Sequence, residues 1–232
     1  MATFWDGPLP PPQARTMDEL RGVLADPGCT DHPSSLYLMY RSCARSDSDR
    51  AWLLRHDLRF DITVIPSAVL CGEYVKTKGH YHPVAPGGAE YPELYEVLSG
   101  TAFFLLQRRD CSDVVAVPAR EDDVVFIPPG YGHVTINPGT ETLVLANIVS
   151  TRFESDYAPY ERHRGAVYYC MEDGWVANPA YETVPPLRCL HRPPALPPGL
   201  CGDDGIYGLL GSCDALRPLN DPSGGVDPFP VI

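Results

Sequence analysis

Apolar residues occur along this chain in short runs, many of which alternate with polar residues. In the segment 58–69, for example, Asp61 and Thr63 alternate with Ile62 and Val64, so that one side of an extended strand would be polar and the other apolar. Residues that favour turns, chiefly Gly, Pro and Asp, separate the runs. The pattern predicts strands over residues 35–40, 58–69, 73–76, the H-x-H segment at 80–82, 94–98, 102–107, 113–117, 124–127, 134–136, 142–150 and 166–172.

This succession of short strands favours an all-β fold, either a sandwich or a small barrel. A small barrel has an interior just large enough to hold one small ligand. The 26 prolines and 20 glycines among 232 residues suit many turns and argue against long helices. One short helix is predicted at residues 16–24, where Thr16 and Glu19 have the spacing of a capping box.

The two ends of the chain differ from its middle. Residues 1–14 are rich in proline and read as an extended arm, and beyond residue 185 Pro-Pro pairs and isolated leucines dominate. We therefore expect an N-terminal arm and helix in 1–34, a barrel in 35–175, and a proline-rich extension in 176–232 that packs on the barrel or on a partner subunit. Arms of this kind gain order by packing on a neighbour, which favours a homodimer.

The net charge and the hydropathy of the chain indicate whether nucleic acids or membranes are expected partners. The net charge is −12 and no basic stripe is present, so no nucleic-acid partner is expected. No apolar run approaches the roughly 20 residues of a membrane span, and the first residues do not have the form of a signal peptide. We expect a cytoplasmic protein, in which a phosphorylated substrate would need a local positive patch or a metal to offset the overall acidity.

The chain has eight cysteines, and none of them has C-x-x-C spacing. In a reducing cytoplasm such cysteines are expected to be free thiols. A zinc site made of cysteines is not indicated by their spacing.

The segment K-T-K-G-H-Y-H carries the most distinctive chemistry. His80 and His82 are two residues apart, and on a β-strand they would point to the same face. Glu93 begins the next predicted strand, and His133 stands where a later strand restarts. Three imidazoles and one carboxylate suit a first-row divalent metal with coordination positions left open for a substrate.

Each of these residues also has a simpler interpretation. An isolated H-x-H pair is more often two solvent-facing histidines on a loop than a metal site. Among the competing carboxylates, Glu90 follows Gly-Gly on a turn, and Glu96 would point away from the face that carries Glu93. We interpret Glu90 and Glu96 as surface acids.

The histidine segments resemble the two motifs of the cupin superfamily. The first motif runs from H-x-H to a Glu and then a Gly, and the spacing from Glu93 to Gly100 fits it. The second has the form P-x-G-x-x-H-x-x-x-N, which is matched by Pro128, Gly130, His133 and Asn137. Two glycines of the superfamily pattern are replaced by Tyr74 and Asp122, and the gap between His82 and Glu93 is longer than usual.

A narrower resemblance covers about residues 35–170. T-K-G-H-Y-H, E-L-Y-E-V-L-S-G, L-L-Q at 105–107 and P-P-G-Y-G-H-V-T-I-N are similar to segments of the cupin-type phosphoglucose isomerases. This resemblance implies a cupin fold, a double-stranded β-helix or jelly-roll barrel. It implies His80, His82, Glu93 and His133 as metal ligands, Glu93 and Tyr95 as catalytic residues, Thr63, Thr77 and Gly79 at the substrate phosphate, and Tyr37, Tyr95 and Tyr157 at the sugar.

The expected function is metal-dependent aldose–ketose isomerisation, most readily of glucose 6-phosphate to fructose 6-phosphate. Archaeal members of the family carry a Tyr and a His where this chain has Val149 and Ser155. These changes leave open a non-heme Fe(II) oxygenase that uses the same ligands, and a non-catalytic sugar-binding cupin is a third alternative. Fe(II) is the expected metal, with Mn, Ni or Zn as alternatives.

Overall fold

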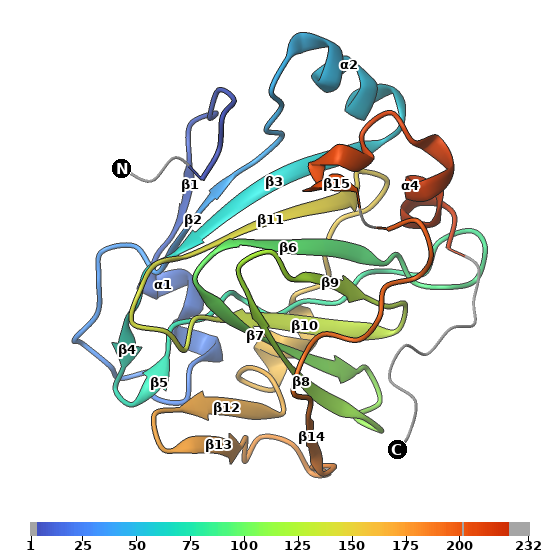
Figure 1. Cartoon of the computed structure of the whole chain (residues 1–232). Coiled ribbons are helices and arrows are strands. Elements are labelled where there is room, and N and C mark those ends of the chain that lie inside the picture. The colour runs from blue at the N-terminus through green and yellow to red at the C-terminus, as the bar shows by residue number, and fades with distance from the viewer. Residues whose placement is uncertain (1–3, 201, 223–232) are drawn as a thin grey trace.

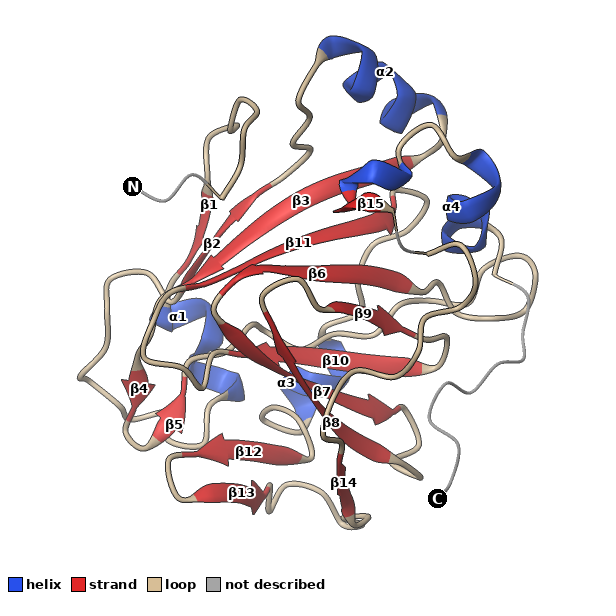
Figure 2. Cartoon of the chain, viewed as in Figure 1, coloured by secondary structure: helices blue, strands red, loops and turns tan. Residues whose placement is uncertain are grey.

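The computed structural model describes residues 4–200 and 202–222, and its strands form three sheets (Figures 1 and 2). The strands pair in the order β1-β2-β3-β11-β6-β9, β10-β7-β8-β14 and β13-β12-β5-β4. The first sheet contains β1 Gln13–Arg15, β2 Tyr37–Tyr40, β3 Leu58–Ile65, β11 Leu143–Ser150, β6 Glu93–Ser99 and β9 Val124–Ile127. The second contains β10 Tyr131–Ile136, β7 Thr101–Arg108, β8 Val114–Arg120 and β14 Leu187–Cys189, and the third β13 Gly174–Ala177, β12 Tyr168–Met171, β5 Glu73–Tyr74 and β4 Val69–Leu70.

The predicted all-β fold is confirmed. The pairs between these strands are antiparallel, apart from the parallel pair of β14 and β8. In the part of the chain that the structure describes, the three sheets do not join into one continuous hydrogen-bonded barrel. The six-stranded sheet instead lies across the second sheet, and buried side chains from both fill the space between them, including Val97, Leu145, Phe104, Leu106 and Val117.

The short N-terminal helix is also confirmed. α1 Met17–Leu20 begins after Thr16, whose backbone N–H donates to the Glu19 carboxylate at 2.9 Å, and a 3-10 turn at Arg21–Val23 continues it. The side chains of Met17 and Leu20 are buried in the core between the sheets. The capping-box prediction therefore identified the start of this helix.

Three helices were not predicted: α2 Asp47–Arg55, α3 Ala158–Arg162 and α4 Cys213–Asn220. The start of α2 does have a local signal, because Ser46 accepts a hydrogen bond from the Asp49 N–H at 3.1 Å and acidic residues follow in the first turn. α4 contains Pro218, and because proline disfavours the interior of a helix, the sequence did not indicate a helix there. None of the helices in the described part of the chain has the length and apolar character that a membrane span requires.

The C-terminal extension packs on the outer face of the six-stranded sheet. Strand β15 Asp203–Ile206, a 3-10 turn at Tyr207–Leu209 and α4 lie beside β3 and β11 (Figure 1, red). Buried residues of the extension join one apolar cluster with the sheet: Leu200, Ile206, Tyr207, Leu209, Leu216 and Leu219 from the extension, and Phe60, Ile62, Leu94 and Ile148 from the sheet. The Ile206 N–H donates to the Glu96 carboxylate at 2.9 Å.

The interpretation of Glu96 as a solvated surface acid is therefore wrong. Its side chain is only partly exposed, and burial raises its pKa. Glu96 lies on the outer face of the sheet, as strand alternation predicts, but the extension covers that face.

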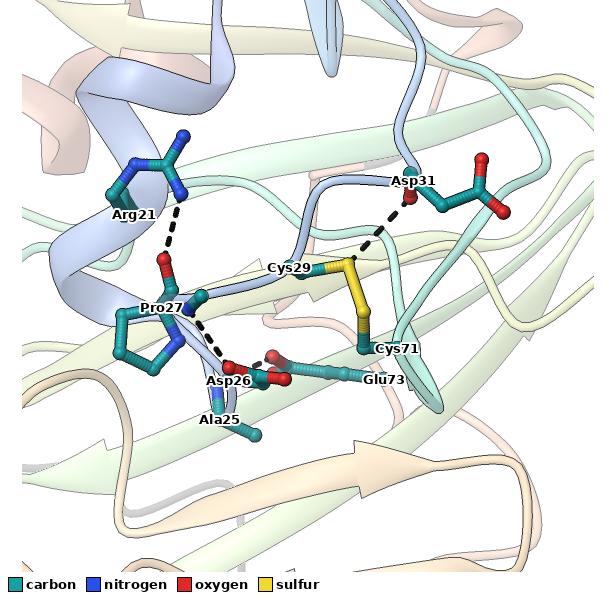
Figure 3. Close-up of a disulfide and its surroundings, with 9 residues drawn as sticks. Arg21, Ala25, Asp26, Pro27, Cys29, Asp31, Cys71 and Glu73 are labelled. Carbon is teal, nitrogen blue, oxygen red and sulfur yellow. Dashed lines mark hydrogen bonds between the residues drawn. A yellow bond between two sulfur atoms is a disulfide. The ribbon is translucent and has the colours of Figure 1, made fainter.

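Cys29 and Cys71 form a disulfide, which corrects the prediction that all the cysteines are free thiols (Figure 3). Their Cα atoms are 5.8 Å apart, because the chain after α1 turns back against the tight turn between β4 and β5. Next to the disulfide, the Ala25 N–H donates to Glu73 at 2.8 Å. Cys43, Cys111, Cys170, Cys189 and Cys213 are free, and Cys201 lies outside the described residues.

Loss of this disulfide should destabilise the protein measurably. The bond closes a loop with a sequence separation of 42 residues, for which loop-closure entropy gives about 4 kcal/mol. We expect Cys71→Ser to lower the free energy of unfolding in urea by this order, whereas Cys189→Ser, at an exposed free thiol, should change it by no more than about 0.5 kcal/mol. Equal stability of the two variants would show that the disulfide contributes nothing.

Candidate metal centre

The structure brings His80, His82, Glu93 and His133 together between the six-stranded sheet, which contains β6, and the sheet that contains β10. Each offers one ligand atom, and these atoms all lie within 4.8 Å of one another. Glu93 opens β6, and His133 lies in the middle of β10. The Glu93 Oε2 atom is 3.4 Å from both His82 Nε2 and His133 Nε2, a spacing that one shared metal ion would produce at ordinary ligand distances.

The strand predicted for the H-x-H segment is not present. In the described residues this segment makes only isolated bridges, one of which pairs His80 with His133. The His133 N–H donates to the His80 carbonyl at 3.1 Å, and the ring centroids of these two residues are 4.4 Å apart. Isolated backbone bridges to β10, at Lys76 and at His80, therefore replace the expected strand and position His80 beside His133.

Hydrogen bonds to the far side of two ligands fix their orientation. The Nδ1 atom of His82 is 2.8 Å from the Tyr91 carbonyl oxygen, which can only accept, so Nδ1 carries the proton and Nε2 presents a lone pair. Asn147 Nδ2 donates to Glu93 Oε1 at 2.7 Å and leaves Oε2 facing the histidines. Contacts of this kind orient metal ligands and fix their tautomers.

The cluster fits a metal ion on the evidence of its own polar atoms. His82 Nε2 and Glu93 Oε2 are buried and have no hydrogen-bond partner among the described residues. Buried polar atoms without a partner are costly and therefore rare in folded proteins. A divalent cation bound between these atoms would satisfy both of them.

Burial shifts the acid–base equilibria of all four groups toward their uncharged forms. Desolvation raises the pKa of Glu93 to about 8, although the nearby Arg41 acts in the opposite direction. Desolvation also lowers the pKa of His82 to about 4 and holds the pKa values of His80 and His133 well below their usual range. The imidazoles are thus neutral at physiological pH, the form in which they can bind a metal ion, and a bound cation would favour the charged form of Glu93.

The cluster opens into a cavity of about 570 Å³, a volume typical of small-molecule sites. Five of the expected substrate residues line it: Tyr37, Thr63, Thr77, Tyr95 and Tyr157. Gly79 does not, because it is buried against Tyr160, whose ring would lie 2.3 Å from a Cβ atom at this position. The need for glycine at residue 79 therefore comes from packing.

Tyr95 lies on the same face of β6 as Glu93 and reaches the cluster of the three histidines and Glu93. Its hydroxyl group is 3.1 Å from His133 Nε2, and its side chain is almost fully buried.

The ring of Phe153 lies 4.5 Å from that of His82 and stacks on Tyr91 at 4.7 Å. Phe153 thus covers one side of the cluster.

Several residues of the cavity were not anticipated from the sequence. Asn147 is one of them, and its only sequence signal is that it is a polar residue inside the apolar strand β11. Arg41 and Arg59 are two others. Val149 and Ser155, where the chain departs from the archaeal pattern, also line the cavity, so these departures change the shape of the site itself.

Comparison with known proteins gives one family match. The model of the glucose-6-phosphate isomerase family matches residues 14–185. The chain is 30% identical over 130 residues to glucose-6-phosphate isomerase of Thermococcus onnurineus, which covers 54% of this chain and 66% of that enzyme. The Sinorhizobium medicae enzyme is 29% identical over 119 residues, covering 51% of this chain and 53% of that enzyme. The matches thus span about half to two thirds of the length of these relatives.

Similarity to solved structures is weaker. Oxalate decarboxylase of Bacillus subtilis, which has Mn(II) centres, aligns over 53% of this chain and 27% of its own with 21% identity and a TM-score of 0.37. Vicilin of hazelnut, Corylus avellana, aligns over 54% of this chain and 32% of its own with 16% identity and a TM-score of 0.39.

Loss of one imidazole should abolish tight metal binding. His82→Ala removes a ligand whose position no neighbouring side chain can fill, and we expect metal affinity to fall by more than the roughly 10–100-fold that loss of a supporting contact costs. Metal content after dialysis, measured by mass spectrometry, tests this. His163→Ala, at a histidine that stacks on Tyr181, is the control. Stoichiometric metal in His82→Ala would show that the ligand set is different.

Asn147→Leu should weaken the centre without removing a ligand. It leaves Glu93 Oε1 without its donor, and metal affinity should fall by roughly 10–100-fold. Calorimetric titration with Mn(II) measures the change, with Ser155→Ala as a cavity control that touches none of the four ligands through a described hydrogen bond. Unchanged affinity in Asn147→Leu would mean that this hydrogen bond does not orient Glu93.

Proposed function

This chain belongs to the glucose-6-phosphate isomerase family, and from that premise we propose that it interconverts glucose 6-phosphate and fructose 6-phosphate. The observation that carries the proposal is the buried cluster of three histidines and Glu93 at a cavity of about 570 Å³. This volume suits one hexose phosphate. We infer that His80, His82, Glu93 and His133 hold one divalent metal ion.

The isomerisation moves a hydrogen atom between neighbouring carbons of the sugar. A base must take a proton from one carbon and return it to the next, through an enediol. Glu93 is the residue we propose for this task, since Asn147 fixes one carboxylate oxygen and leaves the other toward the cluster. A metal bound by the four residues would polarise the carbonyl group and hold the reacting oxygens in place.

Other residues of the cavity would position the substrate. The Tyr95 hydroxyl, beside His133, can donate to a sugar oxygen close to the reacting carbons. Tyr37 and Tyr157 line the same cavity as Thr63 and Thr77, and we propose that these tyrosines bind the sugar while the threonines bind its phosphate. Phe153 limits the access of water to the cluster.

The identity of the metal is a separate proposal. Three imidazoles and one carboxylate bind Fe, Mn, Ni and Zn, and the order of intrinsic affinity does not choose among those available in a cell. We propose Fe(II), with the other three as alternatives.

Assembly and location complete the proposal. We propose a homodimer. The described parts of both arms nevertheless pack within their own chain, because Trp5 stacks on Phe60 and the C-terminal extension covers the outer face of the six-stranded sheet. A cytoplasmic location is proposed because sugar phosphates are intracellular metabolites. The Cys29–Cys71 disulfide is the feature that favours an oxidising compartment instead.

The decisive experiment assays two activities side by side. Protein loaded with Fe(II) should convert fructose 6-phosphate to glucose 6-phosphate without consuming O₂. Oxygen uptake without isomerisation would favour the oxygenase alternative, and tight sugar binding without turnover would favour a binding protein. Either result would overturn the isomerase proposal.

Glu93→Gln separates proton transfer from metal binding. The amide keeps the shape and one coordinating oxygen but loses nearly all basicity, so turnover should fall by on the order of 10²–10⁴, the usual contribution of a positioned acid–base group. Metal content should fall much less, because three imidazoles remain. Near-normal turnover in metal-loaded Glu93→Gln would exclude Glu93 as the base.

A further inference from the structure

Two arginines share one buried carboxylate on the wall of the cavity. Asp61 is fully buried on β3. It accepts hydrogen bonds from Arg41 Nη1 at 2.5 Å, from Arg59 Nε at 2.7 Å and from the Ser42 backbone N–H at 2.9 Å. One negative charge thus faces two guanidinium groups, so this wall carries one positive charge in excess.

The two guanidinium groups are accessible from the cavity. Both arginines line it together with the metal cluster, and their side chains keep 29% and 33% of their surface exposed. Arg59 uses only Nε on Asp61, and its Nη atoms have no other hydrogen-bond partner in the described part of the chain. Arg59 can therefore donate to a ligand without losing its contact with Asp61.

This wall of the cavity is positively charged, although the protein as a whole is acidic. The chain has a net charge of −12, yet three of the five charged side chains that line the cavity, apart from its histidines, are cationic: Arg41, Arg59 and Lys78, against Glu93 and Glu154. Glu154 is exposed at the rim, and Lys78 pairs with Glu161 at 2.5 Å. Asp61 would already be neutralised by Arg41 alone, so the second arginine calls for another explanation.

Strand register gives the position of Arg41 and Arg59 relative to Thr63, which is expected at the substrate phosphate. Thr63 follows Asp61 by two residues on β3, so both point to the same face, and Met39 of β2 pairs in register with Thr63. Arg41 is two residues beyond Met39, which sets it at the level of Asp61. Arg41 is thus close to Thr63, whereas Arg59, four residues before Thr63 on β3, lies level with Val149 of β11. The threonine hydroxyl groups carry no charge, and Gly79 does not line the cavity.

We propose that Arg41 and Arg59, oriented by Asp61, bind the phosphate group of the substrate and select phosphorylated over free sugars. A guanidinium group donates parallel, charge-assisted hydrogen bonds to phosphate oxygens. Because the buried carboxylate already holds both side chains in place, little conformational freedom is lost on binding. The inference rests on the proposed isomerase function for the identity of the ester, but anion binding itself does not require turnover.

The test uses Arg59→Gln, because Asp61 keeps its contacts with Arg41 and Ser42 in this variant. Arg59→Lys retains the charge without the planar fork, and Arg120→Gln removes the same charge from the exposed end of β8, away from the cavity. Binding of inorganic phosphate to metal-loaded protein is measured by calorimetry. KM and kcat are measured with fructose 6-phosphate and with fructose, and thermal unfolding checks that each variant is folded.

We expect Arg59→Gln to weaken phosphate binding and to raise KM for fructose 6-phosphate by at least about 10-fold, the effect of losing a hydrogen bond to a charged group. The kcat value and the kinetics with fructose should change by less than about threefold, Arg59→Lys should recover part of the loss, and Arg120→Gln should resemble wild type. Phosphate affinity in Arg59→Gln equal to that of Arg120→Gln would overturn the inference.

The two proposals fail in different ways. Weaker phosphate binding in Arg59→Gln, in a protein without isomerase activity, would support the anion site and reject the isomerase. Isomerase activity with a KM for fructose 6-phosphate that is insensitive to Arg59 would support the isomerase and reject the anion site.

Discussion

The structure depends on burying a cluster of polar groups that do not neutralise one another. Three imidazoles and a carboxylate lie between the sheets, and desolvation drives all four toward their uncharged forms. Such an arrangement is unfavourable unless a cation completes it. Three contacts hold the candidate ligands in place: the Tyr91 carbonyl at His82, the Asn147 amide at Glu93, and the backbone bridge between His80 and β10.

The six-stranded sheet supports this cluster by carrying different chemistry on its two faces. On the inner face, neighbouring strands present a polar row in register, with Asp61 opposite Asn147 and Asn147 opposite Tyr95. On the outer face, most of the alternate residues are apolar and pack against the C-terminal extension. The polar row can exist in a stable sheet because the outer face, together with the core deeper between the sheets, supplies the apolar burial that folding needs.

Charge is distributed unevenly within the same cavity. The histidines and Glu93 are held by β6, β10 and the H-x-H segment, whereas the two guanidinium groups on Asp61 come from β3 and from the loop after β2, across β11 from β6. A sugar phosphate has a matching asymmetry, with its reacting carbonyl group at one end and its anionic ester at the other. An acidic protein can bind such a substrate because the fold collects a few cations on one wall, where low solvent exposure strengthens their effect.

Most of the strands, the capped N-terminal helix and the four ligand candidates could be recognised in the sequence, because alternation, the capping box and the histidine spacing are local patterns. Val124–Ile127, for example, is predicted and observed with the same limits. The strand expected at the H-x-H segment does not form in the described residues, and β1, β14 and β15 were not expected. The disulfide, Asn147 and the pair of Arg41 and Arg59 could not be predicted in this way. Each depends on strand register or on a loop that brings distant residues together, as when β3, β11 and β6 align Arg59, Val149 and Glu93. Strand register follows from the packing of the whole sheet. The residues that surround the three histidines and Glu93 therefore become known only from the tertiary structure.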